Sequence, residues 1–216
     1  MPKEKLEYWN SKELGEFYYN PNEFQICNSD YLKYVGSETN GSKIKIPQGI
    51  KSCFGMFYHC ENLVTAPLIP EGVKNCNSMF EGCKNLKTAP EIPEGVEKCI
   101  NMFYRCESLE TAPTKIPKRV KHCNCMFAKC KNLITVPSIP EGVESCMNMF
   151  YGCKNLKTAP QIPNGVKNCN SMFLDCESLQ TAPIISEGVE SVINMFEGCV
   201  NLQKAPKYPK TVKWFI

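Results

Sequence analysis

The stretch that decides the fold is NSMFEGCKNLKTAPEIPEGVEKCINM, residues 77–102. It belongs to a phrase that recurs along the chain, and a Met-Phe pair marks each copy. Successive pairs are 23, 23, 24, 23, 23 and 23 residues apart, with their methionines at Met56, Met79, Met102, Met126, Met149, Met172 and Met195. A fixed period of this size is typical of stacked repeats, because one repeat cannot bury its own apolar side chains. The chain is therefore predicted to be a repeat solenoid.

Other apolar residues also recur at fixed places in each copy. One column consists of leucines, at Leu63, Leu86, Leu109, Leu133, Leu156, Leu179 and Leu202. An alanine or valine follows three residues later, and then an isoleucine and a valine. Together with the Met-Phe pair and two cysteines, each turn has about eight apolar positions, which would form one continuous core in a stack.

Most of the 15 cysteines lie in this register. One column follows each methionine by four residues, at Cys60, Cys83, Cys106, Cys130, Cys153, Cys176 and Cys199. Another precedes it by three, at Cys53, Cys76, Cys99, Cys123, Cys146 and Cys169, and ends with Val192 and Phe215. Because cysteine, valine and phenylalanine share this column, it is apolar. Equivalent residues about 4.8 Å apart are close enough for a disulfide, but parallel side chains have poor bridging geometry. We expect buried free thiols.

The segment HCNC, His122 to Cys125, is the one candidate for a metal site. Cys-x-Cys is not the usual zinc spacing and no second ligand pair accompanies it, so we interpret Cys123 as a core residue with outward neighbours. No catalytic triad, paired-carboxylate motif, P-loop or dinucleotide fingerprint is present. The sequence predicts no enzymatic activity, no cofactor and no metal; a thiol-based redox or metal role is the one chemical alternative.

The net charge and the distribution of apolar residues indicate which classes of partner are not expected. The net charge of +3 over 216 residues does not indicate the strongly basic face of a nucleic-acid-binding protein. No apolar run approaches the ~18 residues that span a membrane. The N-terminal MPKEKLEYWNSKELGEF lacks the apolar core and cleavage site of a secretory signal. We therefore expect a cytoplasmic protein or, alternatively, an extracellular one whose signal has been removed.

Each turn has predictable local structure. Proline disfavours helix at the residue before it, so we expect a short parallel strand at Leu86 to Ala89 and its equivalents. Pro-Glu-Gly-Val is a turn, and Val-x-x-Cys is a candidate second strand. The apolar spacing of Met-Phe-x-x-Cys-x-x-Leu predicts one turn of α- or 3-10 helix. One inserted residue, within Ala112 to Ile116, predicts a bulge and a local kink.

The ends of the chain depart from the repeat. Residues 1–43 contain a candidate short helix, Ser11 to Tyr19, and candidate strands at Tyr31 to Val35 and Lys43 to Ile46. Because the end of a solenoid exposes apolar surface, we predict an N-terminal α/β cap over 1–43. The solenoid of seven turns then spans 44–207, and 208–216 form a C-terminal half-repeat cap.

The repeat Leu-x-x-Ala-Pro-x-Ile-Pro-x-x-Val-x-x-Cys-x-x-Met-Phe-x-x-Cys-x-x-Leu resembles the BspA-type, or Treponema pallidum-type, leucine-rich repeats. Its Met-Phe pair resembles repeats of mycoplasma and firmicute surface proteins. The resemblance covers residues 44–216; cysteine replaces the usual isoleucine three residues before the methionine, and an extra residue precedes Ile-Pro. It implies a leucine-rich-repeat solenoid of short parallel strands with a strand-lined face that binds proteins or mediates adhesion. It supplies no catalytic residues.

The candidate partner-binding residues lie just after each leucine. A threonine occurs two residues after it, at Thr65, Thr88, Thr111, Thr135, Thr158 and Thr181. The residue in between varies: Val64, Lys87, Glu110, Ile134, Lys157 and Gln180. A second variable column precedes each isoleucine, at Leu68, Glu91, Lys115, Ser138, Gln161, Ile184 and Lys207. A uniform scaffold with changing outward side chains is how repeat proteins form binding surfaces, although threonines also stack well on a strand for purely structural reasons.

Two functional hypotheses remain open. The first is a non-enzymatic protein-binding module, such as an intracellular inhibitor or adaptor encoded by a phage or other mobile element. The second is a bacterial surface or secreted adhesin that lacks its export signal. Both predict a protein partner and disfavour nucleic acid and membrane; the partner's identity and the oligomeric state do not follow from the sequence.

Overall fold

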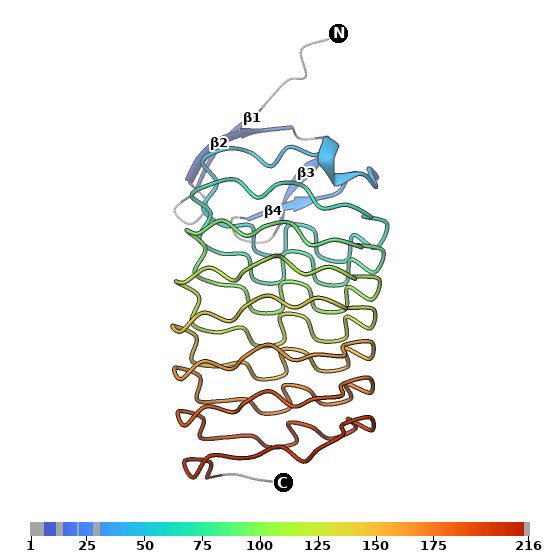
Figure 1. Cartoon of the computed structure of the whole chain (residues 1–216). Coiled ribbons are helices and arrows are strands. Elements are labelled where there is room, and N and C mark those ends of the chain that lie inside the picture. Colours follow the sequence, from blue (N-terminus) through green and yellow to red (C-terminus); the bar gives the residue numbers. More distant parts are fainter. Residues whose placement is uncertain (1–6, 12–14, 21, 28–30, 214–216) are drawn as a thin grey trace.

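The computed structural model describes residues 7–11, 15–20, 22–27 and 31–213. In Figure 1 the chain winds as coils stacked along one axis, with the blue N-terminal strands and the red C-terminal coil at opposite ends. The core runs through the middle of the stack and consists of the same residue types in each coil. Phe80, Leu86 and Val96, for example, are fully buried in one coil, and their equivalents are buried in the next.

Two antiparallel hairpins lie at the N-terminal end. Strand β1 (Glu7–Ser11) pairs with β2 (Gly15–Tyr19), and β3 (Phe24–Cys27) pairs with β4 (Tyr31–Tyr34). The predicted helix at Ser11 to Tyr19 is wrong, since residues 15–19 are a strand. Aromatic residues favour strands, and here Tyr8 and Tyr18 are directly paired with their rings 5.4 Å apart.

The rest of the predicted cap is partly right. Strand β4 confirms the predicted strand at Tyr31 to Val35 to within one residue. The strand predicted at Lys43 to Ile46 is wrong, because a 3-10 turn, η1 (Gly41–Lys43), occupies its start. The side chain of Asn40 accepts a hydrogen bond from the N–H of Ser42 and so caps this turn.

Strand β4 also begins the repeated packing. The N–H of Tyr34 donates to the carbonyl of Met56 at 2.7 Å, just as Phe57 donates to Met79 at 2.8 Å. The ring of Tyr34 lies 5.2 Å from that of Phe57. Tyr34 therefore takes the phenylalanine position one coil before the first Met-Phe pair, inside the segment assigned to the cap. The division of the chain at residues 43 and 207 stays a prediction.

Seven phenylalanines form a continuous ladder through the core. Neighbouring rings are nearly parallel, with centroids 5.4 to 5.7 Å apart and interplanar angles of 3 to 10°: Phe57, Phe80, Phe103, Phe127, Phe150, Phe173 and Phe196. This is the offset-stacked arrangement that aromatic rings prefer, worth about 0.5 to 1.5 kcal/mol a pair beyond the burial of area. The ladder makes each coil dependent on its neighbours.

The Met-Phe segment is a pair of tight turns, so the predicted helical turn is wrong. The N–H of Phe80 donates to Met102 at 2.9 Å and that of Gly82 to Tyr104 at 2.7 Å, both in the next coil. The intervening N–H groups bond three residues back within their own coil. Left-handed φ values at Ser78 (53°) and Gly82 (74°) direct alternate N–H groups along the stack, which a helix does not do.

The predicted parallel strands are reduced to single bridges. Thr65 pairs with Thr88 and Thr88 with Thr111 in one column, and Ser52 pairs with Asn75 in the other. The register of both columns agrees with the prediction, but the pairing does not extend along the chain. The prolines just after each threonine explain this for the first column, because they lack the N–H that a longer ladder needs.

The inserted residue interrupts both columns of bridges. Among the described residues, no bridge joins Lys98 to His122, Thr111 to Thr135 or Thr135 to Thr158. The N–H groups of Ile134 and Thr135 nevertheless still donate to the carbonyl of Glu110 in the preceding coil. Instead Lys115 bridges to Ser138, and the N–H of Ala112 donates to Oγ1 of Thr135 at 3.1 Å. The predicted irregularity at this loop is therefore present as a local loss of pairing.

The 14 cysteines from Cys53 onwards are free, and all of them are buried, as predicted, except the half-buried Cys60, Cys125 and Cys199. The column after the methionine has a polar role as well: Cys83 donates its thiol to the carbonyl of Phe57, and Cys106 to that of Phe80, both at 3.1 Å. Within the described part of the chain, the column before the methionine forms no such bond, and Val192 is buried in it. One column is therefore purely apolar, whereas the other adds a second hydrogen bond to a carbonyl of the preceding coil, which already accepts from an N–H of its own coil.

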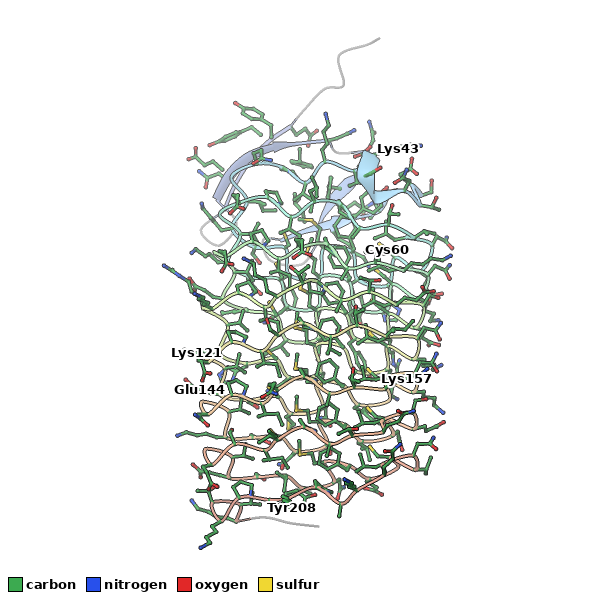
Figure 2. All side chains as sticks on the ribbon, viewed as in Figure 1. Lys43, Cys60, Lys121, Glu144, Lys157 and Tyr208 are labelled. Atoms are coloured by element: carbon green, nitrogen blue, oxygen red, sulfur yellow. The ribbon has the colours of Figure 1, made fainter. Side chains whose placement is uncertain are left out.

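Ion pairs join neighbouring coils along the outer edges. Lys121 lies next to Glu144 on one edge, with Nζ and Oε1 3.4 Å apart (Figure 2). Similar pairs on that and other edges are Lys74–Glu97, Lys213–Glu190, Lys84–Glu61, Lys131–Glu107 and Lys154–Glu177. Because these side chains are solvent-exposed, each pair contributes only about 0 to 1 kcal/mol.

The difference between the two cysteine columns can be measured with a matched pair of variants. Cys99→Ala and Cys106→Ala remove the same atoms from fully buried sites in adjacent columns. Only Cys106→Ala also removes a hydrogen bond, so we expect it to lower the free energy of unfolding by about 0.5 to 1.5 kcal/mol more than Cys99→Ala does. Urea denaturation of both variants checks this. Equal losses would show that the thiol hydrogen bond contributes nothing.

Candidate binding face

The predicted threonines form an exposed ladder along one side of the stack. All six are exposed, and Thr65 and Thr88, for example, bridge neighbouring coils through their backbones. We call the surface formed by these threonines and the two variable columns beside them the threonine face. The ladder ends at Thr181, because Lys204 occupies the equivalent place in the last coil.

The column just before the threonines also faces outward. Lys87, Glu110, Lys157 and Gln180 are exposed, and Val64 is half-buried. Ile134 is 59% exposed, although an isoleucine usually seeks the core. The structure therefore places the predicted residues on one face, and whether a partner binds them stays a prediction.

The second variable column differs along its length. At the ends of the stack it presents apolar side chains, with Leu68 85% and Ile184 75% exposed. In the middle the charged residues have partners within the protein. Glu91 accepts hydrogen bonds from the N–H and hydroxyl of Thr114, and Lys115 lies 2.5 Å from Glu94. The exposed apolar side chains of this column thus lie near its two ends.

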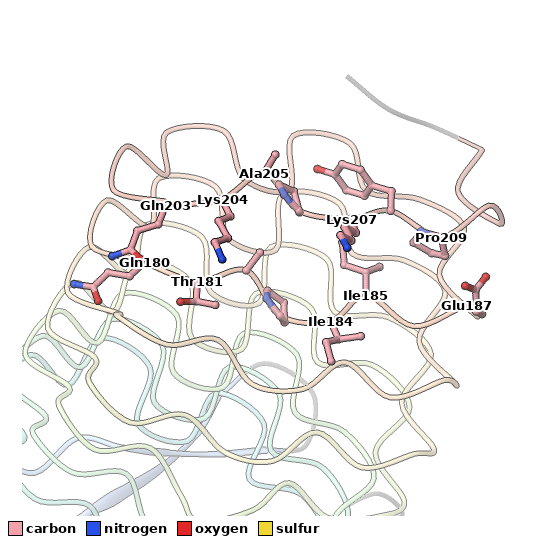
Figure 3. A pocket seen from close by; sticks show the side chains of 14 residues that line it. Gln180, Thr181, Ile184, Ile185, Glu187, Gln203, Lys204, Ala205, Lys207 and Pro209 are labelled. Atoms are coloured by element: carbon pink, nitrogen blue, oxygen red, sulfur yellow. The ribbon is translucent and has the colours of Figure 1, made fainter.

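A shallow groove lies on the threonine face between the last two coils. Its volume is about 460 Å³, and Figure 3 shows Gln180, Lys204 and Ile184 among the side chains around it. Sequence reasoning did not single out this groove. The replacement of threonine by Lys204 was the available signal, since it breaks a column that is otherwise uniform.

The three tyrosines that follow Met-Phe pairs lie away from this face. Tyr104 is half-buried with the guanidinium of Arg105 over its ring at 5.2 Å, and Tyr151 has Lys129 over its ring at the same distance. Tyr58 is 40% exposed. Cation–π contacts hold at least two of these rings against the Met-Phe side of the stack, which favours a structural role.

Among the residues that the structure describes, the side chains are not grouped into a chemical centre. In the part of the chain that the structure describes, no three His, Cys, Asp or Glu side chains are grouped as a metal site would require. Burial raises the pKa of the Cys53, Cys123 and Cys169 thiols to about 12, and that of Cys60 and Cys199 to about 11. Because the thiolate is the reactive form, these thiols are weak nucleophiles at neutral pH. The described residues also contain no helix long and apolar enough to cross a membrane.

Short coils held by a leucine column, isolated parallel bridges and a ladder of outward residues define a leucine-rich-repeat protein. The chain belongs to the BspA-type leucine-rich repeat family, whose model matches residues 32–145 and 99–215 in six copies. This confirms the family indicated by the sequence.

Two solved structures share the fold. A leucine-rich repeat protein of T. pallidum has a TM-score of 0.65 with 22% identity, over 94% of this chain and 90% of that one. A leucine-rich repeat protein from Bacteroides ovatus has a TM-score of 0.64 with 17% identity, over all of this chain but only 55% of that one. At these identities the likeness extends to the fold alone. No curated protein sequence matches the chain closely.

The raised pKa values of the buried thiols predict that the free energy of unfolding falls steeply at alkaline pH. A thiol ionises near pH 8.5 in the unfolded chain but only near pH 12 at Cys53, Cys123 or Cys169 in the fold. The buried neutral thiol makes its full contribution to the free energy of unfolding below pH 8.5. This contribution is lost as the pH rises towards 12, at about 1.4 kcal/mol per pH unit for each thiol. These three cysteines can be replaced with valine, the residue at position 192. Between pH 9 and 10 the free energy of unfolding of this variant should then fall less steeply with pH than that of the original protein, by about 4 kcal/mol per pH unit. Urea titrations at both pH values measure it, and an unchanged slope would contradict the assignment.

Proposed function

We propose that the chain is a non-enzymatic protein-binding module whose partner lies across the threonine face. The observation that supports this most directly is the contrast between two kinds of outward column. The threonine ladder is uniform over six coils, whereas the columns beside it change from apolar to charged to amide from coil to coil. A uniform, rigid base with changing side chains is suited to recognising one particular protein surface.

The physical character of the face agrees with a protein partner. Leu68, Ile134 and Ile184 expose large apolar surfaces that would be buried in a complex. The face is long and shallow, and the groove between its last two coils is open, so it differs from the enclosed pocket that buries a small ligand. The stacked core holds the side chains in place, which limits the entropy lost on binding.

The more specific roles are also proposals. An inhibitor or adaptor of the cytoplasm, encoded for instance by a phage or mobile element, is favoured over a surface adhesin by the state of the cysteines. The 14 free thiols between Cys53 and Cys199 suit a reducing compartment.

Substitutions across the ladder test the binding face. Thr111→Arg and Thr158→Arg place long charged side chains on exposed positions near the middle of the face. We expect the double variant to weaken binding of a partner captured from the native host by at least about tenfold, or 1.4 kcal/mol. Affinity is measured by biolayer interferometry with purified proteins.

The matched control is Glu197→Arg, an exposed position on the Met-Phe side. It should leave the affinity within about twofold, below ~0.5 kcal/mol. If the control weakens binding as much as the threonine variants do, the partner does not lie on the threonine face.

Labelling of intact host cells tests the location. An amine-reactive reagent that cannot cross membranes should leave the protein unmodified, while the same reagent labels exposed lysines such as Lys51 and Lys204 after lysis. Labelling without lysis would support the adhesin alternative and contradict the cytoplasmic proposal.

A further inference from the structure

The positive charge of the chain is concentrated in its last coil. Residues 198–216 contain four lysines and no aspartate or glutamate. The rest of the chain has 21 lysines and arginines against 22 acidic residues, so it is close to neutral, and the whole chain has a net charge of +3. One end of the stack therefore differs electrostatically from everything before it.

Three of the four lysines of this coil have no carboxylate partner among the described residues. Lys204, Lys207 and Lys210 are exposed and form no ion pair with any residue that the structure describes. Lys213 is the exception, since its Nζ lies 3.1 Å from Oε2 of Glu190. In the other basic segment, at the inserted residue, three cations are instead paired with carboxylates of neighbouring coils: Lys115–Glu94, Arg119–Glu97 and Lys121–Glu144.

Two of these lysines border the groove on the threonine face. Lys204 and Lys207 lie along it, and Ile184, which is 75% exposed, lies across from them on the preceding coil (Figure 3). The amides of Gln180 and Gln203 are at one end. The groove thus combines two cations, two amides and an apolar wall. Glu187, the one acidic residue that lines it, is at the opposite end from the glutamines.

We propose that this groove binds an acidic, extended segment of the partner protein, with one apolar side chain of that segment against Ile184. The lysines would attract carboxylates, and primary amides can both donate to and accept from an extended backbone. The apolar wall favours a peptide over a sulfated sugar, which has no large apolar side chain to bury. This inference rests on the proposed function and places one part of the partner on the face.

A synthetic peptide tests the groove directly. The probe is a fluorescein-labelled nonapeptide of glutamates with a central leucine, and its reference replaces the leucine with serine. Fluorescence anisotropy with the full chain should show tighter binding of the leucine peptide. Exchanging both groove lysines, Lys204→Glu and Lys207→Glu, should weaken binding by at least about tenfold, because attraction becomes repulsion.

The control exchanges two other exposed lysines that lie off the threonine face, Lys51→Glu and Lys98→Glu. It changes the net charge equally and should weaken binding less than about threefold, since distant exposed charges are screened by salt. Ile184→Ser should weaken binding of the leucine peptide but not of the serine peptide. A change in net charge could not cause this difference, because the substitution leaves the charge unchanged. Thermal melts confirm that these surface variants fold.

Three outcomes would overturn the inference. They are equal losses from the two lysine pairs, no difference between the leucine and serine peptides, or binding of a sulfated oligosaccharide as tight as that of the peptide. A captured partner separates this inference from the proposed function. If Thr111→Arg and Thr158→Arg weaken its binding while Lys204→Glu and Lys207→Glu do not, the binding face stands and only the role of the groove fails. If neither set has an effect, the proposed function fails as well.

Discussion

The structure depends on hydrogen bonds that run along the stack from the Met-Phe segments. Alternate N–H groups of each segment donate to carbonyls of the next coil, so they fix both the spacing and the register of the coils. The phenylalanine rings follow from this constraint. Coils joined by backbone bonds lie about 4.8 Å apart, and rings on equivalent positions must stack with an offset at 5.4 to 5.7 Å.

The close stacking of the coils also bears on the unusual cysteine content. The carbonyl of Phe57 accepts from the N–H of Cys60 in its own coil, and a carbonyl oxygen has a second lone pair. The thiol of Cys83, in the next coil, is small enough to be buried there and donates to the same oxygen at 3.1 Å. Valine would fill the space without donating, and serine would bring a more polar group into an apolar core. Among the described residues, the other cysteine column makes no such bond, and there Val192 is accepted.

The period of the repeat was enough to predict the stack, the buried columns and the outward threonines. It could not separate a helical turn from two tight turns at the Met-Phe segment, because both bury residues with the spacing i, i+1, i+4. The signal lay in the residues before and after: Gly55, Asn101 and Gly152 stand at left-handed positions that glycine and asparagine favour. The hairpin β1–β2 was missed because local helix signals competed with aromatic residues whose strand preference depends on pairing. The groove was missed because it depends on the packing of two coils rather than on a motif.

The inserted residue at 112–116 has a mechanical consequence. On the Met-Phe side the axial hydrogen bonds pass through this level without a break, since Phe103 still donates to Met126 at 2.9 Å. On the threonine side the bridge from Thr111 to Thr135 is lost, but the N–H groups of Ile134 and Thr135 still donate to the carbonyl of Glu110. On the remaining side the bridge between Lys98 and His122 is absent from the described structure. The stack is therefore held along two sides at this level and more loosely along the third, so it bends most easily in the direction that opens the third side.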